Sequence, residues 1–299
     1  MINPNKTLLL GFPDYAPQTR ALATALGVPY AEIALHRFPD GESRLRLPAS
    51  LPPKVLLCRS LDDPNAKLVE LLFAAGTARE LGAVELTLVA PYLCYMRQDR
   101  AFHPGEAVSQ RQLGRFLAEQ FDAVITVDAH LHRVHRLADA VPVEHALNLS
   151  AAALLGRYAA QRFDDPLLLG PDEESAQWVE AAARADGLDS AVARKHRSDD
   201  RRVSIALPDV DLRGRTVVLV DDIASTGHTL ARAAEAVYAK GASAVHALVC
   251  HALFVEDAEA QLQRADIRSL HSTDSISHPT NAIGLAELLA GACKKLLRN

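Results

Sequence analysis

The chain has 299 residues, of which 49% are hydrophobic and 23% charged, and 37 acidic against 32 basic residues give a formal net charge of −5. This charge excludes a general electrostatic attraction to nucleic acid or to an anionic membrane surface, and the length suits two domains. The four cysteines form no CxxC pair, and no apolar run approaches the roughly 18 residues of a membrane span. We therefore expect a soluble, cytoplasmic protein with reduced thiols.

Short runs rich in Val, Ile and Leu alternate along the chain with longer stretches of helical periodicity. The runs that predict strands are 6–12, 54–60, 85–92, 122–128, 165–170, 216–222 and 243–250. The stretches that predict helices are 16–26, 64–81, 106–120, 148–161, 174–185, 227–240 and 255–264. Because parallel strands need crossover helices and are buried on both faces, this alternation predicts α/β domains, each a mainly parallel sheet flanked by helices.

A boundary between two domains is expected shortly after Pro142. This proline ends one unit, and Asn148 or Ser150 can cap a helix that begins the next. We place the boundary near residue 147, which gives an N-terminal domain of residues 1–147 and a C-terminal domain of residues 148–299. Each half has an apolar strand that runs into a polar turn, which suggests an internal duplication.

The turn after the predicted strand 216–222 has the features of a phosphate site. Gly227 allows the main chain to approach a ligand closely, and the next helix begins there with unpaired N–H groups that favour an anion. Ser225, Thr226 and Thr229 add hydroxyl donors. A phosphate is the expected ligand of this turn.

Asp221 and Asp222, at the carboxyl end of the same strand, need a different ligand because carboxylates repel phosphate. Sugar hydroxyls and Mg²⁺ both suit a carboxylate, so a sugar phosphate satisfies the whole turn. The alternative is that the acids only cap the helix and the small residues only form the turn. A Rossmann or P-loop site is disfavoured, because GxGxxG and GxxxxGK[ST] are absent.

Residues 217–230, VVLVDDIASTGHTL, resemble the phosphoribosyl-diphosphate (PRPP) binding signature of the type I phosphoribosyltransferase fold. Other segments resemble, in the right order, the motifs of ribose-phosphate diphosphokinases, or PRPP synthetases: residues 36–47, 90–100, 127–130, 170–175 and 194–198. The resemblance covers nearly the whole chain. It implies two type I phosphoribosyltransferase-like domains and transfer of the β,γ-diphosphoryl group of ATP to the C1 hydroxyl of ribose 5-phosphate, which gives PRPP and AMP.

The resemblance also implies an ATP site with residues from two segments. In YMRQDR, a guanidinium and an amide offer donors and acceptors to phosphate and base, and the family pattern assigns ATP contacts to Arg97 and Gln98. The FPDGE turn resembles the segment that reaches the adenine site of a neighbouring subunit, which implies a homo-oligomer. The implied ATP-binding residues are Phe38, Asp40, Gly41, Glu42, Arg97 and Gln98.

A metal site is implied by His130 and Asp172, which each follow a predicted strand. Two such ligands are too few for a closed zinc site but suit Mg²⁺ that keeps water and substrate phosphates as its other ligands. His132 and His135 are expected to be surface histidines. The implied ribose 5-phosphate residues are Arg197, Asp221, Asp222, Ser225, Thr226, Gly227, His228 and Thr229.

Lys195 and Arg197 match the catalytic Lys-x-Arg loop of the family. Two residues apart, their side chains would point the same way on an extended segment. Taken alone, a solvated basic loop is the simpler interpretation. Positioning and cationic stabilisation would carry most of a diphosphoryl transfer, and no strong general base stands out.

Two other functions compete with a synthetase. A phosphoribosyltransferase that consumes PRPP would explain the 217–230 turn but would leave YMRQDR, VDAH and KHR without a role. A catalytically silent regulatory homologue is the third hypothesis, and the presence of His130, Asp172, Lys195 and Arg197 together disfavours it.

The chain departs from the usual pattern of this family in two places. Glu173 to Ser175 stand where many members have His-Gly-Gly, and residues 99–109 resemble archaeal-type members.

Overall fold

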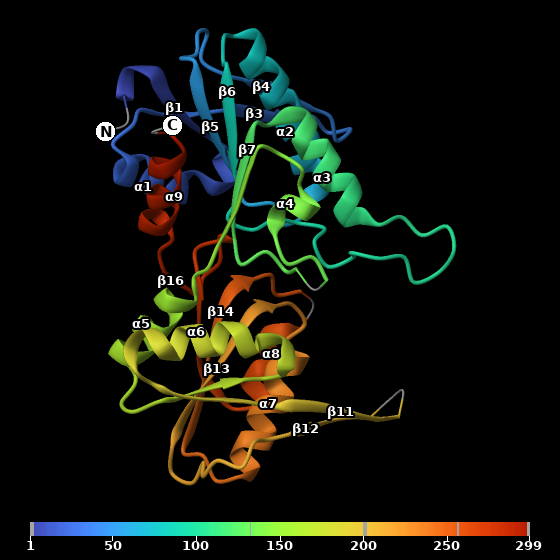
Figure 1. Cartoon of the computed structure of the whole chain (residues 1–299), viewed down its shortest axis with the longest axis vertical. Helices are drawn as coiled ribbons and strands as arrows, with labels where there is room; N and C mark the ends of the chain where they lie inside the picture. The colour runs from blue at the N-terminus through green and yellow to red at the C-terminus, as the bar shows by residue number, and fades with distance from the viewer. Residues whose placement is uncertain (1–2, 132, 200–201, 256, 298–299) are drawn as a thin grey trace. The chain divides into compact units, whose positions relative to one another are not determined.

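The computed structural model describes residues 3–131, 133–199, 202–255 and 257–297, with the side chains of 195–199 and 202–205 outside the description. Contacts divide the chain into two units (Figure 1). The first contains Met1–Leu149, Ser275–Ser277 and Leu285–Asn299, and the second contains Ser150–Asp274 and His278–Gly284.

The first unit is built on a parallel sheet in which, among the described residues, six strands follow the order β2-β1-β5-β6-β7-β8. The strands are β1 (Thr7–Gly11), β2 (Tyr30–Glu32), β5 (Lys54–Cys58), β6 (Glu85–Val89), β7 (Ala123–Val127) and β8 (His145–Leu149). The helices are α1 (Ala16–Leu26), α2 (Pro64–Glu80), α3 (Ser109–Gln120), α4 (Leu137–Ala140) and α9 (Ala286–Leu296). A separate antiparallel hairpin consists of β3 (Ala34–Arg37) and β4 (Ser43–Arg46).

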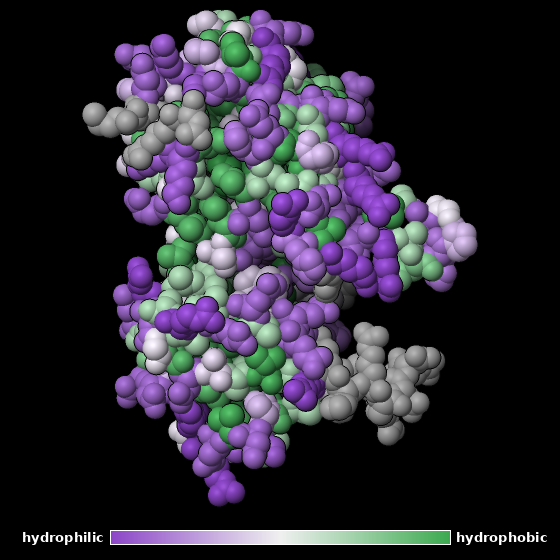
Figure 2. Space-filling model, viewed as in Figure 1, coloured by the Kyte–Doolittle hydropathy of each residue, from purple (hydrophilic) through white to green (hydrophobic). Residues whose placement is uncertain are grey.

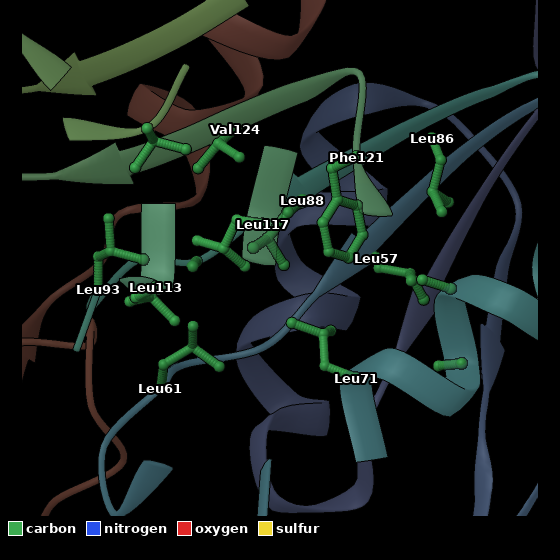
Figure 3. Close-up of a cluster of buried hydrophobic side chains, with 14 of the residues drawn as sticks. Leu57, Leu61, Leu71, Leu86, Leu88, Leu93, Leu113, Leu117, Phe121 and Val124 are labelled. Carbon is green, nitrogen blue, oxygen red and sulfur yellow. The ribbon is translucent and has the colours of Figure 1, made fainter. Parts of the chain in front are cut away.

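One face of the first sheet packs against α2 and α3. Leu57 and Leu88 from neighbouring strands meet Leu71 of α2 and Leu117 of α3 in a buried cluster (Figure 3). All four side chains are fully buried, and each such leucine stabilises the fold by about 1.5 to 3 kcal/mol relative to exposure. This packing fixes the carboxyl ends of β5 and β6, where the polar segments of the unit begin.

The second unit repeats this arrangement. Within the described residues its main sheet is also parallel and six-stranded, in the order β10-β9-β13-β14-β15-β16. The strands are β9 (Leu167–Gly170), β10 (Asp189–Val192), β13 (Thr216–Ala224), β14 (Ala244–Ala252), β15 (Ile267–Thr273) and β16 (Asn281–Ile283). The helices are α5 (Ala152–Arg162), α6 (Ala176–Asp186), α7 (His228–Ala239) and α8 (Ala258–Arg264), and the hairpin is β11 (Arg194–Asp199) with β12 (Arg202–Ala206).

The central strand β13 is buried on both faces. Val217 and Leu219 pack into the core beneath α7 and α8, whereas Val218 and Val220 pack beneath α5 and α6. Side chains alternate across a strand, so the uninterrupted apolar run follows from helices on both sides. This confirms the prediction of a covered parallel sheet.

All seven predicted strands and all seven predicted helices are present, in the predicted order and in two parallel-sheet units. Several boundaries differ from the prediction, and two of them bear on the domain boundary and on the site. The helix expected from residue 148 begins at Ala152, because residues 145–149 form the edge strand β8 beside β7. The strand expected at 216–222 continues to Ala224, so both acids lie inside β13, where it is still paired with β14.

The C-terminal helix α9 was not predicted and belongs to the first unit, so residues 285–299 lie outside the second unit to which the range 148–299 assigns them. It packs against α1 and against β7 and β8, and Lys294 Nζ donates to the Ala25 carbonyl at 2.7 Å. Leu289, Ala290 and Cys293 are buried there. In the second unit α5 packs on α6 in the corresponding way, so α9 supplies the helix that the first sheet otherwise lacks.

The described helices include none that is both long and apolar enough to cross a membrane. Hydrophilic side chains cover much of the surface visible on each unit (Figure 2).

Candidate functional site

Three carboxylates come together at the carboxyl ends of the neighbouring strands β9 and β13. Asp172 follows β9, and Asp221 and Asp222 lie in β13. Asp172 and Asp222 are buried, and the Asp222 N–H donates to Asp221 Oδ1 at 3.0 Å. Burial, together with the charges of Asp222 and Asp172, raises the pKa of Asp221 well above its ordinary value. A bound cation or a hydrogen-bond donor would stabilise this cluster.

Asp172 is held in place by the short 3-10 helix η3 (Glu173–Ser175) that follows it. Asp172 Oδ1 accepts from the N–H groups of Glu174 and Ser175 at 3.1 and 3.4 Å, and Ser175 Oγ donates to the Asp172 carbonyl at 2.6 Å. Glu174 and Ser175 thus orient this carboxylate. Among the described side chains no three His, Cys, Asp or Glu residues form a metal-binding group.

The loop after β13 depends on Gly227 for its shape. Gly227 has a φ of +77°, and a Cβ added there would lie 3.2 Å from the Ala258 carbonyl oxygen and 3.3 Å from the Leu262 side chain. Only glycine suits both conditions. The Ser225 carbonyl accepts from the Val255 N–H at 3.1 Å, which ties the loop to the chain before α8.

The predicted phosphate donors lie together at the N-terminus of α7. Ser225, Thr226 and Thr229 are partly buried, and their hydroxyls make no hydrogen bond to another described residue. No side chain caps α7, so its first N–H groups and these hydroxyls are available to a ligand. His228 is exposed, with Nδ1 3.4 Å from the Thr226 carbonyl.

Lys195 and Arg197 lie on β11, opposite Ile205 and Val203 of β12. The extended backbone that their spacing requires is therefore present, on a hairpin that extends from the second unit (Figure 1). Their side chains lie outside the described part of the structure, so their catalytic role remains a prediction.

The YMRQDR segment follows β6 in the first unit. Ser109 Oγ donates to Gln98 Oε1 at 2.6 Å, whereas Arg97 is exposed and contacts no charged partner among the described residues. Asp99 is buried and accepts from the Arg133 guanidinium at 2.7 Å. Burial alone would raise the pKa of Asp99, but the hydrogen bonds and charge of Arg133 lower it. Asp99 therefore fixes the segment and leaves Arg97 accessible.

The FPDGE turn forms the tip of the β3–β4 hairpin. Phe38 N–H donates to the Glu42 carbonyl at 2.8 Å, Gly41 N–H donates to the Phe38 carbonyl at 3.0 Å, and Gly41 has a φ of +94°. Asp40 Oδ1 accepts from the Glu42 N–H at 3.1 Å. Phe38 is 39% exposed and both acids are exposed, so the tip presents a ring and two carboxylates.

His130 follows a tight turn after β7. Asp128 has a φ of +38°, and Ala129 N–H donates to Asn148 Oδ1 at 2.9 Å. His130 belongs to the first unit and Asp172 to the second, so their joint metal binding remains a prediction. His132 lies outside the described residues, and His135 is exposed, as expected.

The sequence analysis missed a buried ion network at the carboxyl end of β5. Arg59 is fully buried, its Nη2 lies 2.6 Å from Glu70 Oε2, and its Nε lies 3.2 Å from Asp14. Its guanidinium carbon lies 4.0 Å from the centroid of the Phe12 ring. Although burial opposes ionisation, hydrogen bonds from Arg37, Ser43 and Arg59 lower the pKa of Glu70 to about 2. The signal in the sequence is a single arginine directly after the apolar run KVLLC.

Comparison with known proteins agrees with the family suggested by these motifs. Residues 11–120 match the N-terminal domain of ribose phosphate pyrophosphokinase, and residues 146–284 match the phosphoribosyl transferase domain. A ribose-phosphate pyrophosphokinase of Methanopyrus kandleri is 37% identical over 280 residues, covering 93% of this chain and 95% of the relative. Ribose-phosphate pyrophosphokinase 2 of Archaeoglobus fulgidus is 34% identical over 271 residues, or 91% and 94% of the two chains.

A solved structure confirms the fold. The phosphoribosylpyrophosphate synthetase from Mycobacterium smegmatis matches 98% of this chain and 99% of its own with a TM-score of 0.83, at 22% identity. The chain belongs to the ribose-phosphate pyrophosphokinase family. Its fold is a pair of α/β units, and its phosphoribosyltransferase domain contains the carboxylate cluster and the Gly227 loop.

Proposed function

We propose that the protein transfers the β,γ-diphosphoryl group of ATP to the C1 hydroxyl of ribose 5-phosphate and releases PRPP and AMP. The observation that carries the proposal is the position of the cluster of Asp172, Asp221 and Asp222, at the strand ends that lead to the open N-terminus of α7. A ligand with hydroxyls at one end and a phosphate at the other satisfies both. Family membership supports the diphosphokinase reaction on such a ligand.

In this proposal the α7 loop binds the 5-phosphate. The first N–H groups of α7 and the hydroxyls of Ser225, Thr226 and Thr229 donate to it, and Gly227 permits the close approach of the main chain. Asp221 and Asp222 accept hydrogen bonds from ribose hydroxyls and so orient the C1 hydroxyl for attack on the β-phosphorus. Sugar donors also reduce the repulsion within the cluster.

Cations stabilise the diphosphoryl group during transfer. We assign Lys195 and Arg197 to this role, because their two-residue spacing on an extended strand lets both contact one polyphosphate. The donor set of His130 and Asp172 suits Mg²⁺, with substrate oxygens and water as the remaining ligands. Bound Mg²⁺ would neutralise phosphate charge. Asp221 and Asp222 would hold the ribose so that its C1 hydroxyl approaches the β-phosphorus from one direction.

ATP binds, in this proposal, to surfaces that can come from two subunits. Arg97 is exposed and unpaired among the described residues, and Gln98 is oriented by Ser109, which suits contacts with phosphate and base. The Phe38 ring and the acids of the hairpin tip form the adenine side of a site in a neighbouring subunit. The protein would therefore act as a homo-oligomer, and we assign it to the cytoplasm.

The reaction can be tested by mixing the protein with Mg²⁺, ATP and ribose 5-phosphate and separating the nucleotides. We expect AMP and PRPP in equal amounts. ADP as the product would indicate an ordinary kinase and contradict the proposal. Consumption of PRPP with a free base, without AMP formation from ATP, would instead indicate a phosphoribosyltransferase.

A further inference from the structure

The turn end of the β3–β4 hairpin is held by a single buried carboxylate. Arg37 ends β3, Ser43 begins β4, and the two residues are paired across the hairpin. Glu70 of α2 accepts from Arg37 Nε at 2.8 Å, from Arg37 Nη2 at 3.2 Å and from Ser43 Oγ at 2.8 Å. These two residues directly flank the Phe38–Glu42 tip, so Glu70 fixes both of its ends.

Glu70 is itself held from the protein interior. Its side chain is fully buried, and it is ionised because its pKa is lowered to about 2. Arg59 Nη2 donates to Glu70 Oε2 at 2.6 Å. Arg59 is held in turn by an ion pair with Asp14 and by a hydrogen bond from its Nη1 to the Lys67 carbonyl at 3.4 Å. A charge-assisted, bidentate arrangement of this kind fixes direction as well as distance. The carboxylate is a rigid attachment point for the hairpin.

We propose that Glu70, held by Arg59, is a positioning residue for the ATP site. Through Arg37 and Ser43 it sets the direction in which the Phe38 ring and the carboxylates of Asp40 and Glu42 leave the first unit. The inference rests on the proposed function, in which this tip binds the adenine side of ATP. We call Glu70 with Arg37 and Ser43 the hairpin clamp. A hairpin that is ordered before ATP arrives loses less conformational entropy on binding, so the hairpin clamp should strengthen the binding of ATP and leave the binding of ribose 5-phosphate unchanged.

The hydrogen bonds from Arg37 and Ser43 to Glu70 can be removed without changing the buried pair of Arg59 and Glu70. The double variant Arg37→Gln with Ser43→Ala removes both tethers, and the Arg37 side chain is 53% exposed, so no cavity forms in the core. Arg59 and Glu70 stay paired. The matched control is Arg46→Gln on β4. It removes an exposed charge from the same hairpin, and the Arg46 side chain makes no hydrogen bond or ion pair with another described residue.

We expect the double variant to raise the KM for ATP about tenfold, because small misplacements of binding groups have large effects. The KM for ribose 5-phosphate should stay within about twofold of the wild-type value, since that site lies in the second unit. Ser43→Thr, which keeps the hydroxyl, should rescue the effect of Ser43→Ala. An unchanged KM for ATP, or an equal rise in both KM values, would overturn the proposal.

Hydrogen exchange of the amides of Phe38, Gly41 and Glu42 in the ligand-free protein gives a readout that does not need activity. The double variant should exchange faster at these positions, whereas Arg46→Gln should match the wild type. Unchanged exchange would contradict positioning by Glu70. If the wild type makes no PRPP from ATP and ribose 5-phosphate, the proposed function fails, and faster exchange would still show that the clamp orders the hairpin.

Discussion

The two units of the chain have the same arrangement of strands, but the charged residues at the corresponding strand ends differ. Both have strand orders of the same pattern, a hairpin outside the main sheet, and a Pro-Asp pair after the second strand of the order, at Asp14 and at Asp172. Next to Asp172, β13 contributes two acids, and the pKa of Asp221 is raised. Next to Asp14, β5 leads to Arg59, and the pKa of Glu70 is lowered to about 2.

The difference shows how one scaffold gives either a cluster of neighbouring carboxylates or an internal ion network. In the second unit the neighbouring carboxylates Asp172 and Asp222 raise the pKa of Asp221. In the first unit the buried Arg59 guanidinium balances the charges of Glu70 and Asp14, and the site is closed. Removing one carboxylate should therefore have opposite effects on the stability of the two units.

Glu70→Gln breaks the closed site and should produce the largest change in stability. It leaves the buried Arg59 without its main counter-charge, which commonly costs about 3 to 5 kcal/mol. For a unit of this size we expect the Tm to fall by about 10 °C. Thermal melting followed by circular dichroism measures this, with Glu80→Gln, an exposed acid at the end of the same helix, as the control.

The effect of Glu70→Gln should depend on pH in a defined direction. Because the folded-state pKa lies below the unfolded-state value, the contribution of Glu70 is present above the unfolded pKa and is lost as pH falls through the folded pKa. The gap between variant and wild type should close between about pH 5 and pH 2. A gap that stayed constant would show that shape, and not charge, is what Glu70 contributes.

Lys195→Ala addresses the hairpin of the second unit, the counterpart of the β3–β4 hairpin. Under the proposed function we expect kcat to fall by about 10² to 10³ while ATP still binds, since the lost donor acts on the transferring group. Steady-state kinetics and equilibrium binding of ATP measure the two effects. Lys240→Ala, which removes an exposed charge next to α7, should be fully active; wild-type turnover by Lys195→Ala would refute the assignment.

Asp221→Asn should stabilise the second unit while it weakens activity. The amide keeps an oxygen that can accept from the Asp222 N–H but removes one of three neighbouring charges, a change worth about 1 kcal/mol. Asp221 titrates with a raised pKa, so the gain should be present near neutral pH and should vanish at pH values below its unfolded pKa. A melting series from pH 7 to pH 3 checks this, and exposed Asp209→Asn is the control. A loss of stability at neutral pH would contradict the repulsion.

The smallest expected effect concerns two histidines under α5. Burial, with the charges of Arg268, His271 and Arg162, lowers the pKa of His246, and burial with Arg162 lowers that of His271. The unfolded chain therefore binds more protons below about pH 6.5, and stability falls as pH decreases from 7 to 5. His271→Gln should reduce this loss by about 1 to 2 °C in Tm. An identical slope in wild type and variant would exclude the histidine as its cause.

Much of the architecture could be predicted from local patterns. The apolar runs and helical periodicities identified most of the longer elements, though not the seven-residue strand β15 or the helix α9, because burial on two faces and amphipathic packing are visible as periodic patterns in the sequence. The sequence patterns of the short edge strands, of both hairpins and of α9 are weaker, and these elements were not predicted. A three-residue strand such as β2 or β16 has no period to detect, and α9 is defined by the surface on which it packs.

The candidate site divides in the same way. Gly227 and the hydroxyls of its loop were predictable, because a left-handed residue before a helix and a set of donors are local properties. The meeting of Asp172 with Asp221 could only be expected from the rule that strand ends share one edge. The link from Arg59 to Glu70 and Arg37 joins three segments and had no local signal.

The sequence by itself determined the class of fold, the family and the position of the loop to which we assign a phosphate, since each depends on short-range spacing or on a contiguous motif. Tertiary structure alone decided which charges are balanced. Whether a carboxylate is repelled or balanced by its neighbours depends on the partner that packing brings to it. At the end of β13 that packing brings more carboxylates, and at the end of β5 it brings a buried arginine.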